Sequence, residues 1–279
     1  MRIYTKSGDL ALRTFNFPDG QPHLVLETYD IDFREITVEV ALKSSVDLFN
    51  LLLVSSVLRT HGYSQVNLNC RYLLGARMDR AIDSTQPFTL EVVARLINSC
   101  GFSKVRILDV HSDVALRLIR NSDNIRPLRC AQQAITASGA TVIVAPDKGG
   151  AHRAQMVWGA GQNGTIIYCT KERDPQTGAL SGFRVHDYEP EKDGTSCIIV
   201  DDICDGGNTF VGLAKELRKA GAKKVFLYVT HSIFSKGIPL EGIDHIYTTD
   251  SFIHREMLSF PDKQKREVTI ISISMKDLL

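Results

Sequence analysis

The sequence lacks the features that assign a chain to several common classes. Its 279 residues hold no apolar run long enough to span a bilayer, and the first residues lack the apolar core of a signal peptide. No two of the six cysteines form a C-x-x-C pair, so free thiols are expected rather than disulfides or a zinc site. A net charge of +1 gives no drive towards nucleic acid or anionic membranes. With 43% hydrophobic and 23% charged residues, the chain is expected to be a globular cytoplasmic protein without a nucleic-acid or membrane partner.

The familiar nucleotide-binding and catalytic motifs are absent as well. There is no G-x-x-x-x-G-K-[ST] loop, which excludes a Walker-type phosphate site. Neither G-x-S-x-G nor H-E-x-x-H occurs, and the protein-kinase motifs are missing. If the chain binds ATP, it therefore does so through another arrangement.

The segment 196–210, SCIIVDDICDGGNTF, shows the clearest functional pattern. Its apolar run CIIV predicts a strand buried on both faces of a parallel sheet. Asp201 and Asp202 follow this run, then come residues 205–209, DGGNT, and a helical pattern starts at Phe210. Ligands of open α/β sheets bind at the carboxyl ends of strands, and a glycine loop before a helix suits an anion. The order of these features predicts a ligand site.

The residue types in this segment indicate which ligand it would take. Asp201 and Asp202 repel a phosphate, but they suit sugar hydroxyls or a divalent cation that bridges to a diphosphate. The glycine loop suits a phosphate. Together they predict a ribose-phosphate site. A simple strand-to-helix turn is the alternative, and Gly-Gly alone would favour it.

The remaining pattern is that of alternating helices and strands. A segment at 174–184, DPQTGALSGFR, has the composition of a mobile loop. Apolar spacing predicts helices at 46–59, 89–100 and 211–220, and strands at 36–41, 66–70, 104–110, 141–145, 166–169, 225–229 and 268–273.

An internal repeat divides the chain into two similar halves. Residues 94–112 and 214–232 share the order helix, Gly, Lys-Val, strand, His-Ser, and His231 follows His111 by 120 positions. The repeat predicts an α/β protein with two domains, 1–130 and 131–279. Each is expected to have a central, mostly parallel sheet built from right-handed crossovers and flanked by helices.

Seven short segments in order resemble the motifs of the ribose-phosphate diphosphokinase, or PRPP synthetase, family. The resemblance runs from about Phe15 to Asp250. It implies two tandem type I phosphoribosyltransferase-like domains, the first on the ATP side and the second on the ribose-phosphate side. The segments are 17–21 (FPDGQ), 75–80 (GARMDR), 108–111 (LDVH), 145–150 (APDKGG), 170–173 (TKER), 200–209 (VDDICDGGNT) and 230–235 (THSIFS).

The resemblance also implies a reaction and an assembly. The family is an enzyme family in which a sugar C1 hydroxyl attacks the β-phosphorus of ATP, AMP leaves, and Mg²⁺ assists. The acceptor is expected to be ribose 5-phosphate, giving PRPP, or ADP-ribose, as in phage-type members that act in NAD metabolism. The resemblance implies a dimer-based homo-oligomer such as a hexamer.

Roles for individual residues follow from the same resemblance. Lys171, Arg173 and His111 would be catalytic, and His111 and Asp147 would hold the metal. The residues that would bind ATP are Phe17, Asp19, Gln21, Arg77 and Asp79, and the first two would reach it from a neighbouring subunit. The residues that would bind the ribose phosphate are Asp201, Asp202, Asp205, Gly206, Gly207, Asn208 and Thr209.

Several positions depart from the family pattern. Met78 and Gln21 replace polar or acidic residues near the nucleotide, Gly206 removes a hydroxyl from the phosphate loop, and Asn208 adds a side chain. These changes keep ADP-ribose open as the acceptor. Two other functions stay open: the segment 196–210 also fits a PRPP-consuming phosphoribosyltransferase, and Met78, Gln21 and Asn208 fit a non-catalytic regulatory partner of the synthetase.

Overall fold

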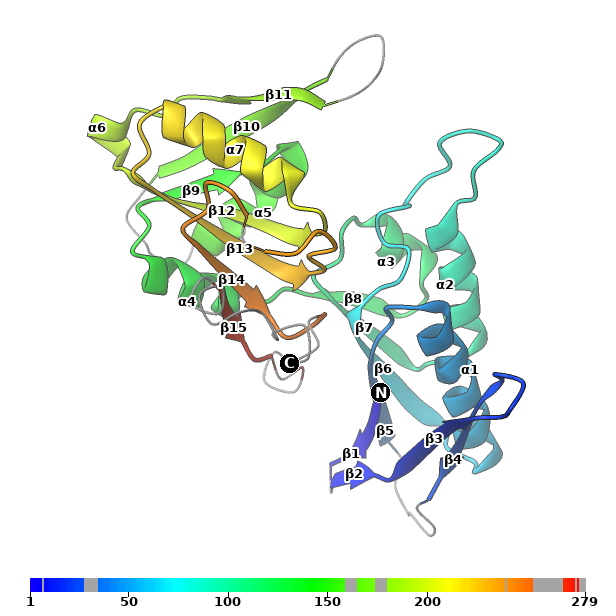
Figure 1. Cartoon of the computed structure of the whole chain (residues 1–279). Helices are drawn as coiled ribbons and strands as arrows, with labels where there is room; N and C mark the ends of the chain where they lie inside the picture. The colour runs from blue at the N-terminus through cyan, green and yellow to red at the C-terminus, as the bar shows by residue number, and fades with distance from the viewer. Residues whose placement is uncertain are drawn as a thin grey trace. The chain divides into compact units, whose positions relative to one another are not determined.

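The chain forms two structural units that are described separately (Figure 1). Unit 1 comprises Met1–Arg126 with Met275–Leu279, and unit 2 comprises Pro127–Ser274, so the division follows Arg126 rather than residue 130. The computed structural model describes all residues except 7, 28–34, 159–164, 174–179, 239, 253–267, 274 and 276–279, and it leaves out the side chains of 148, 171–173, 180 and 181.

Unit 1 has a six-stranded sheet in the order β2-β1-β5-β6-β7-β8, in which β5 to β8 are parallel. Its strands are β1 (Arg2–Thr5), β2 (Gly8–Leu10), β5 (Glu35–Ala41), β6 (Gln65–Tyr72), β7 (Lys104–Leu108) and β8 (Ser122–Ile125). The crossover helices are α1 (Ser45–Thr60), α2 (Thr89–Ser99) and α3 (Val114–Leu118). Because successive parallel strands are neighbours, right-handed crossovers place all three helices on one face, and α2 contacts both α1 and α3.

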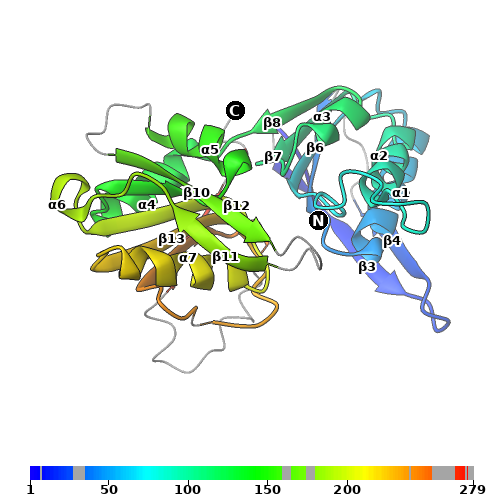
Figure 2. The same cartoon turned by 90° about the horizontal axis from the view of Figure 1, so that it is seen from above.

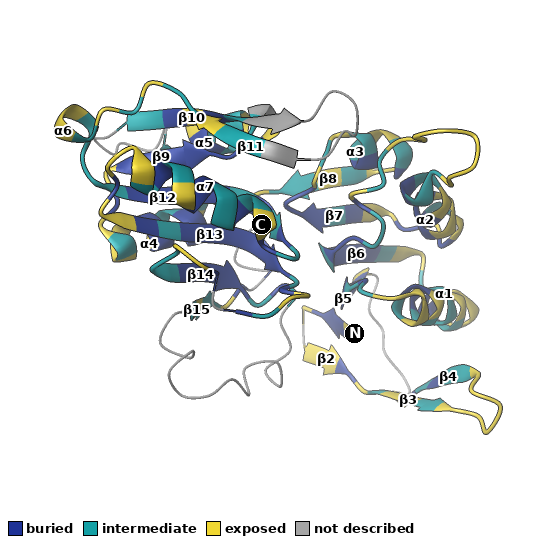
Figure 3. Cartoon of the chain, turned by 45° about the horizontal axis from the view of Figure 1, so that its top comes forward, coloured by how far each residue is buried: buried dark blue, intermediate teal, exposed yellow. Residues whose placement is uncertain are grey.

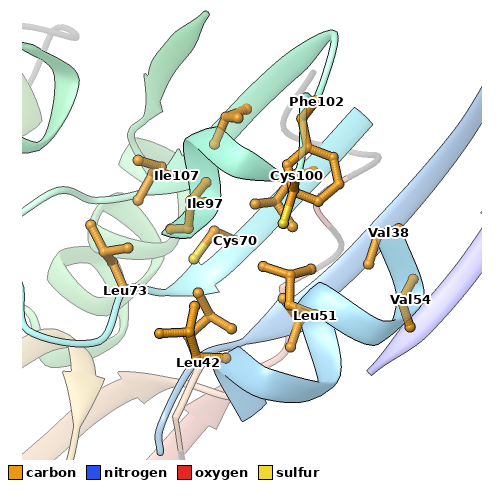
Figure 4. Close-up of a cluster of buried hydrophobic side chains, with 14 of the residues drawn as sticks. Val38, Leu42, Leu51, Val54, Cys70, Leu73, Ile97, Cys100, Phe102 and Ile107 are labelled. Atoms are coloured by element: carbon orange, nitrogen blue, oxygen red, sulfur yellow. The ribbon is translucent and has the colours of Figure 1, made fainter. Parts of the chain in front are cut away.

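The core of unit 1 lies between this sheet and its helices. Leu51 and Val54 of α1 face Val38 of β5, and all three side chains are fully buried (Figure 4). Ser44 and Asp47 form a capping box that fixes the start of α1. Each fully buried leucine or valine contributes about 1.5–3 kcal/mol of transfer free energy, so the apolar face of α1 determines where it packs.

A separate hairpin of β3 (Leu12–Asn16) and β4 (Pro22–Leu26) packs on α1 through β4. Its turn is closed by the N–H of Phe17, which donates to the carbonyl of Gln21 at 2.8 Å, and by the N–H of Gly20, which donates to Phe17 at 2.8 Å. The motif segment 17–21 therefore forms the tight turn between β3 and β4.

Unit 2 has a seven-stranded sheet in the order β11-β10-β9-β12-β13-β14-β15, in which only the β10–β11 pair is antiparallel. Helices α4 and α5 cover one face and α7 covers the other (Figure 2). The elements are α4 (Leu128–Ser138), β9 (Val142–Ala145), α5 (Lys148–Trp158), β10 (Thr165–Arg173), β11 (Leu180–Val185), α6 (Pro190–Asp193), β12 (Ser196–Cys204), α7 (Asn208–Lys219), β13 (Lys224–Ser232), β14 (His245–Thr249) and β15 (Val268–Ile271).

The two crossovers at the centre of this sheet run in opposite directions. From β9 the chain passes through α5 to β10 on one side, whereas from β12 it passes through α7 to β13 on the other. Since β9 and β12 are parallel neighbours, their carboxyl ends form a topological switch point. In open α/β sheets this is the place where ligands bind.

The predicted pattern of helices and strands is confirmed, and so is the repeat. β7 and β13 begin at Lys104 and Lys224, 120 positions apart, and each follows a helix and pairs in parallel with the preceding strand. The run CIIV of β12 is completely buried, as expected for a central strand (Figure 3). All six cysteines are buried and free, as expected.

Several predicted boundaries differ from the structure, and three of these differences bear on the candidate site. β12 continues to Cys204, so the two acids lie on the strand instead of after it, because β13 pairs with β12 as far as Ser232. β10 continues to Arg173, because β11 supplies an antiparallel partner. Residues 180–184, predicted as loop, belong to β11, while 174–179 lie outside the described residues. No described helix is long and apolar enough to cross a membrane.

Candidate active site

The switch point of unit 2 brings together carboxylates from two strands. Asp147 follows β9 by two residues, and Asp201 and Asp202 lie near the end of β12. The pairing of Val144 with Ile199 aligns the two strands, so these residues lie at one edge of the sheet. The charge of Asp147 acts on Asp201, which is a further sign of their proximity.

Arg153 of α5 holds the two acids of β12. Its Nη1 atom lies 3.4 Å from Oδ1 of Asp201 and 3.7 Å from Oδ1 of Asp202, and the side chains of Arg153 and Asp201 are each 16% exposed. The N–H of Asp202 also donates to Asp201 Oδ1 at 3.0 Å. One guanidinium therefore engages both carboxylates, which are the groups predicted to meet the ribose.

The pKa of Asp201 is raised well above its ordinary value. Burial is the largest cause, because it disfavours the charged carboxylate, and the neighbouring charge of Asp202 adds to it. Arg153 opposes this rise, whereas Asp147 adds to it. The site therefore concentrates negative charge that one arginine does not fully offset, as expected of a functional carboxylate.

The glycine loop ends at the N-terminus of α7. Gly207 is the N-cap residue, with a φ of 77°, and no side chain caps the helix. A Cβ atom at Gly207 would overlap the side chain of Leu240, so only glycine fits this conformation and this space. The first amides of α7 thus point towards the carboxyl edge of the sheet, which suits an anion such as a phosphate.

Asp147 also has a structural role. It precedes the first residue of α5, and its Oδ1 atom accepts the N–H of Gly150 at 3.0 Å. This is the geometry of a helix N-cap. The bond fixes the orientation of the carboxylate that the sequence assigns to a metal.

Lys171 and Arg173 occupy the end of β10. Their partners on β11 are Phe183 and Leu180, and the register shifts between Glu172 and Arg173. Their side chains lie outside the described residues, so their catalytic role stays a prediction.

The residues of unit 1 that were predicted to be functional lie in two places. Arg77 and Asp79 lie in the loop after β6, and His111 follows the end of the neighbouring strand β7. The carboxyl ends of parallel neighbours meet at one edge, so these residues belong to the same edge of the sheet. Arg77 and His111 are exposed, and Asn124 fixes the backbone before His111 by accepting the N–H of Val110 at 3.1 Å.

The other three nucleotide residues lie on the hairpin turn. Phe17, which is 42% exposed, forms a ring cluster with Phe15 and His23, with centroid distances of 5.3–5.4 Å. The N–H of Gln21 donates to Asp19 Oδ1 at 3.0 Å, which orders the turn. The turn extends away from α1 in Figure 3, and its residues 17–21 are exposed. Its predicted contact with a neighbouring subunit stays a prediction.

Asp147 and Asp201 could hold a metal ion together with a substrate phosphate. Among the described residues, no three histidine, cysteine or acidic side chains form a cluster that could hold an ion. Mg²⁺ is commonly held by one or two carboxylates together with substrate phosphates. Asp147 beside Asp201 fits that pattern, because the repulsion that raises the pKa of Asp201 is relieved by a cation.

Comparison with known proteins gives consistent matches. The model of the phosphoribosyl transferase domain matches residues 128–256. The ribose-phosphate pyrophosphokinase of Marinomonas sp. is 29% identical over 246 residues, covering 85% of this chain and 74% of its own length. The corresponding protein of Pyrococcus furiosus is 27% identical, with coverages of 79% and 77%. Over most of its length the chain is therefore similar to proteins named ribose-phosphate pyrophosphokinase.

A solved structure shows that the fold agrees with this family. The crystal structure of phosphoribosylpyrophosphate synthetase from Mycobacterium smegmatis matches with a TM-score of 0.77 and 19% identity, covering 96% of this chain and 88% of its own. The predicted α/β fold with tandem phosphoribosyltransferase-like domains is confirmed. The relatives reported above carry the name of an enzyme, ribose-phosphate pyrophosphokinase.

Two residues near the site bear on the sequence interpretation. Arg153 was missed, because an arginine within a helix is usually a surface charge and only the packing of α5 on β12 brings it to Asp201. Cys204, which lies between the two acids and the glycine loop, is fully buried, and burial raises its pKa to about 12. Such a thiol is a poor nucleophile.

Proposed function

We propose that this protein transfers the β,γ-diphosphate of ATP to the C1 hydroxyl of a 5-phosphorylated ribose and releases AMP. The observation that carries the proposal is the switch point of unit 2, where a carboxylate pair and an uncapped helix N-terminus lie at one edge. Carboxylates accept hydrogen bonds from ribose hydroxyls, and the helix amides bind the phosphate. Ribose 5-phosphate is the default acceptor, and ADP-ribose is the variant.

Unit 2 holds the acceptor in this proposal. Asp201 and Asp202 accept hydrogen bonds from the ribose hydroxyls, while Arg153 keeps both carboxylates in place. The loop from Asp205 to Thr209 binds the 5-phosphate, with Gly206, Gly207 and Asn208 contributing backbone N–H groups. Fixing the sugar at both ends leaves its C1 hydroxyl oriented for attack.

Unit 1 supplies groups for the nucleotide. Arg77 contacts ATP phosphates, Asp79 belongs to the same loop, and the hairpin residues Phe17, Asp19 and Gln21 bind the base of ATP held by a neighbouring subunit. Lys171 and Arg173 stabilise the negative charge that develops on the phosphoryl oxygens. A homo-oligomer follows from the role given to the hairpin.

Magnesium completes the charge balance of the proposed site. Asp147 is the proposed magnesium ligand of unit 2 and His111 that of unit 1, and bound Mg²⁺ would neutralise charge on the ATP phosphates. Asp147 is already oriented by its bond from Gly150, so it needs little reorganisation to accept a cation. The enzyme is proposed to act in the cytoplasm on small molecules.

An assay of AMP release tests the proposal. Purified protein is mixed with ATP and Mg²⁺, and either ribose 5-phosphate or ADP-ribose is added. Release of AMP with at least one acceptor, and its loss when Mg²⁺ is chelated, is expected. Absence of AMP with both acceptors contradicts the proposal.

A PRPP-consuming phosphoribosyltransferase is the second candidate. The match of the phosphoribosyl transferase domain to residues 128–256 favours it, because the model covers the acceptor half alone. Release of pyrophosphate from PRPP and a nucleobase, without ATP, would support this activity. If neither reaction occurs, a non-catalytic regulatory role becomes the better interpretation.

A further inference from the structure

Lys236 lies over the glycine loop that precedes α7. A Cβ atom added to Gly206 would stand 3.3 Å from both Cδ and Cε of Lys236, so the methylene chain of the lysine packs directly on Gly206. The ammonium group follows Cε by one bond, which places its charge beside the loop. Because Lys236 is exposed, its ammonium can reach a ligand held there.

The backbone around Lys236 is tied to the end of β12. The N–H groups of Ile233 and Phe234 donate to the carbonyl of Cys204 at 2.8 and 3.2 Å. Phe234 has a φ of 48°, which is unusual for a bulky residue, and the N–H of Gly237 donates to its carbonyl at 2.8 Å. This closes a tight turn that contains Lys236. The surrounding structure therefore imposes the conformation that brings the lysine to the glycine loop.

The charges near the loop explain why a cation is useful there. Asp201, Asp202 and Asp205 lie at or just after the end of β12, and each repels a phosphate. Arg153 is engaged with the first two of them. The helix terminus supplies only a partial positive charge, and Gly206 has no hydroxyl to donate. A lysine packed on Gly206 provides the missing full charge and donor.

We propose that Lys236 binds the phosphoryl group on O5 of the acceptor ribose and thereby sets the affinity for the acceptor. This inference rests on the proposed function, because it assigns the glycine loop to the acceptor. The same chemistry applies to the terminal phosphate of ribose 5-phosphate and to the esterified phosphate of ADP-ribose. A contact remote from the reacting C1 hydroxyl binds ground and transition states alike, so it lowers KM without changing kcat.

Substitution of Lys236 in the full-length enzyme tests this assignment. Lys236→Met keeps a linear chain on Gly206 and removes the charge, whereas Lys236→Arg keeps the charge. Lys224→Met is the matched control, since Lys224 is exposed and begins β13, eight residues and about 26 Å of strand before Ser232. This distance is about three Debye lengths at physiological salt, so the loss of charge in Lys224→Met should have little electrostatic effect at the glycine loop.

The acceptor KM of Lys236→Met is expected to rise about tenfold, equivalent to about 1.4 kcal/mol. Its kcat and its KM for ATP should stay within about twofold of wild type, as expected for a contact with the acceptor alone. Lys236→Arg and Lys224→Met should retain nearly the wild-type acceptor KM. If Lys236→Met raises KM for ribose 5-phosphate alone, the terminal phosphate is the ligand of Lys236. If it raises KM for both acceptors, the ligand is the phosphoryl group that they share.

The outcomes separate this inference from the proposed function. If wild type releases AMP and Lys236→Met has an unchanged KM for both acceptors, the inference is overturned and the proposed function stands. If wild type releases no AMP, the proposed function fails, and calorimetry with ribose 5-phosphate alone then decides the role of Lys236. Weaker binding to Lys236→Met than to Lys224→Met supports the inference, whereas equal affinities or no binding to wild type overturn it.

Discussion

Replacing Gly212 with alanine should reduce activity far more than stability. Gly212 lies in α7, where an added Cβ atom would stand 2.8 Å from Cδ2 of Phe183 and overlap Cε2 of the same ring. Phe183 lies on β11 directly opposite Lys171 on β10. The absence of a side chain at Gly212 therefore lets the β10–β11 hairpin rest on α7, and the proposed catalytic lysine depends on that position.

Two opposing effects set the size of the stability change. Glycine to alanine within a helix gains about 1 kcal/mol of helix propensity, whereas overpacking of a core contact costs about 1–3 kcal/mol. The net destabilisation is then between about zero and 2 kcal/mol, and each kcal/mol lowers Tm by about 2–4 °C for a domain of 150–250 residues. Carbon atoms in contact prefer about 3.5–4.0 Å, so the ring must move by about 1 Å.

A displacement of that size matters more for catalysis. A shift of about 1 Å in a positioned group can lower the rate about 100-fold. We therefore expect Gly212→Ala to lose about 100-fold in kcat, while Tm falls by no more than about 8 °C. Initial rates of AMP release and a thermal melt measure the two quantities on the same preparation.

The double variant Gly212→Ala/Phe183→Leu provides the control. A leucine leaves room for the alanine, so the double variant should recover much of the kcat that Gly212→Ala loses, after correction for Phe183→Leu alone. Wild-type kcat in Gly212→Ala would refute the reasoning, since the hairpin would then tolerate the shift. Failure of Phe183→Leu to restore any activity would show that the loss does not arise from this contact.

The remaining predictions concern the carboxylate pair of β12. Arg153→Gln should lower the free energy of unfolding by about 3 kcal/mol, because it removes the guanidinium from two largely buried acids. Adding Asp201→Asn to this variant should restore part of the lost stability. Denaturant melts of the single and double variants measure this coupling. Asp201→Asn alone should raise Tm at neutral pH and weaken acceptor binding. Because the pKa of Asp201 is raised in the folded state, the unfolded chain ionises first as pH rises. As pH rises from the pKa of Asp201 in the unfolded chain to its higher pKa in the folded protein, wild type therefore becomes less stable relative to Asp201→Asn. The stability advantage of the variant should vanish as pH is lowered towards about 4, the ordinary pKa of an aspartate. An advantage of Asp201→Asn that is the same at pH 4 and pH 7 would exclude titration of Asp201 as the cause.

The order of elements was largely predictable because it depends on local patterns. The apolar run at Cys197–Val200 is a buried strand, and the 120-residue repeat corresponds to two helix–strand units that begin β7 and β13 at matching positions. The boundaries that were wrong depend on partners. β10 reaches Arg173 because β11 pairs with it, and the sequence of β10 alone does not indicate that partner.

The candidate site was predictable only where its residues follow one another in the chain. Asp201, Asp202 and the glycine loop lie within nine residues, so their order is visible in the sequence. Arg153 precedes Asp201 by 48 residues and Lys236 follows Gly206 by 30, and each reaches the site through packing between elements. Isolated basic residues in a helix and in a turn carry no pattern that distinguishes them from surface charges.

Arg153 and Lys236 have different electrostatic roles in the site. Arg153 is fixed on both carboxylates, so its charge is largely used within the protein and helps to keep Asp201 ionised against the effect of burial. Lys236 is exposed, and its methylene chain rests on the glycine loop, so its charge faces outward to a ligand. A phosphorylated sugar needs both, since its hydroxyls require ionised carboxylates and its phosphate is repelled by them. Loss of Arg153 should therefore affect stability and acceptor binding together, whereas loss of Lys236 should affect acceptor binding alone, and this difference is the clearest way to separate a structural cation from one that meets the substrate.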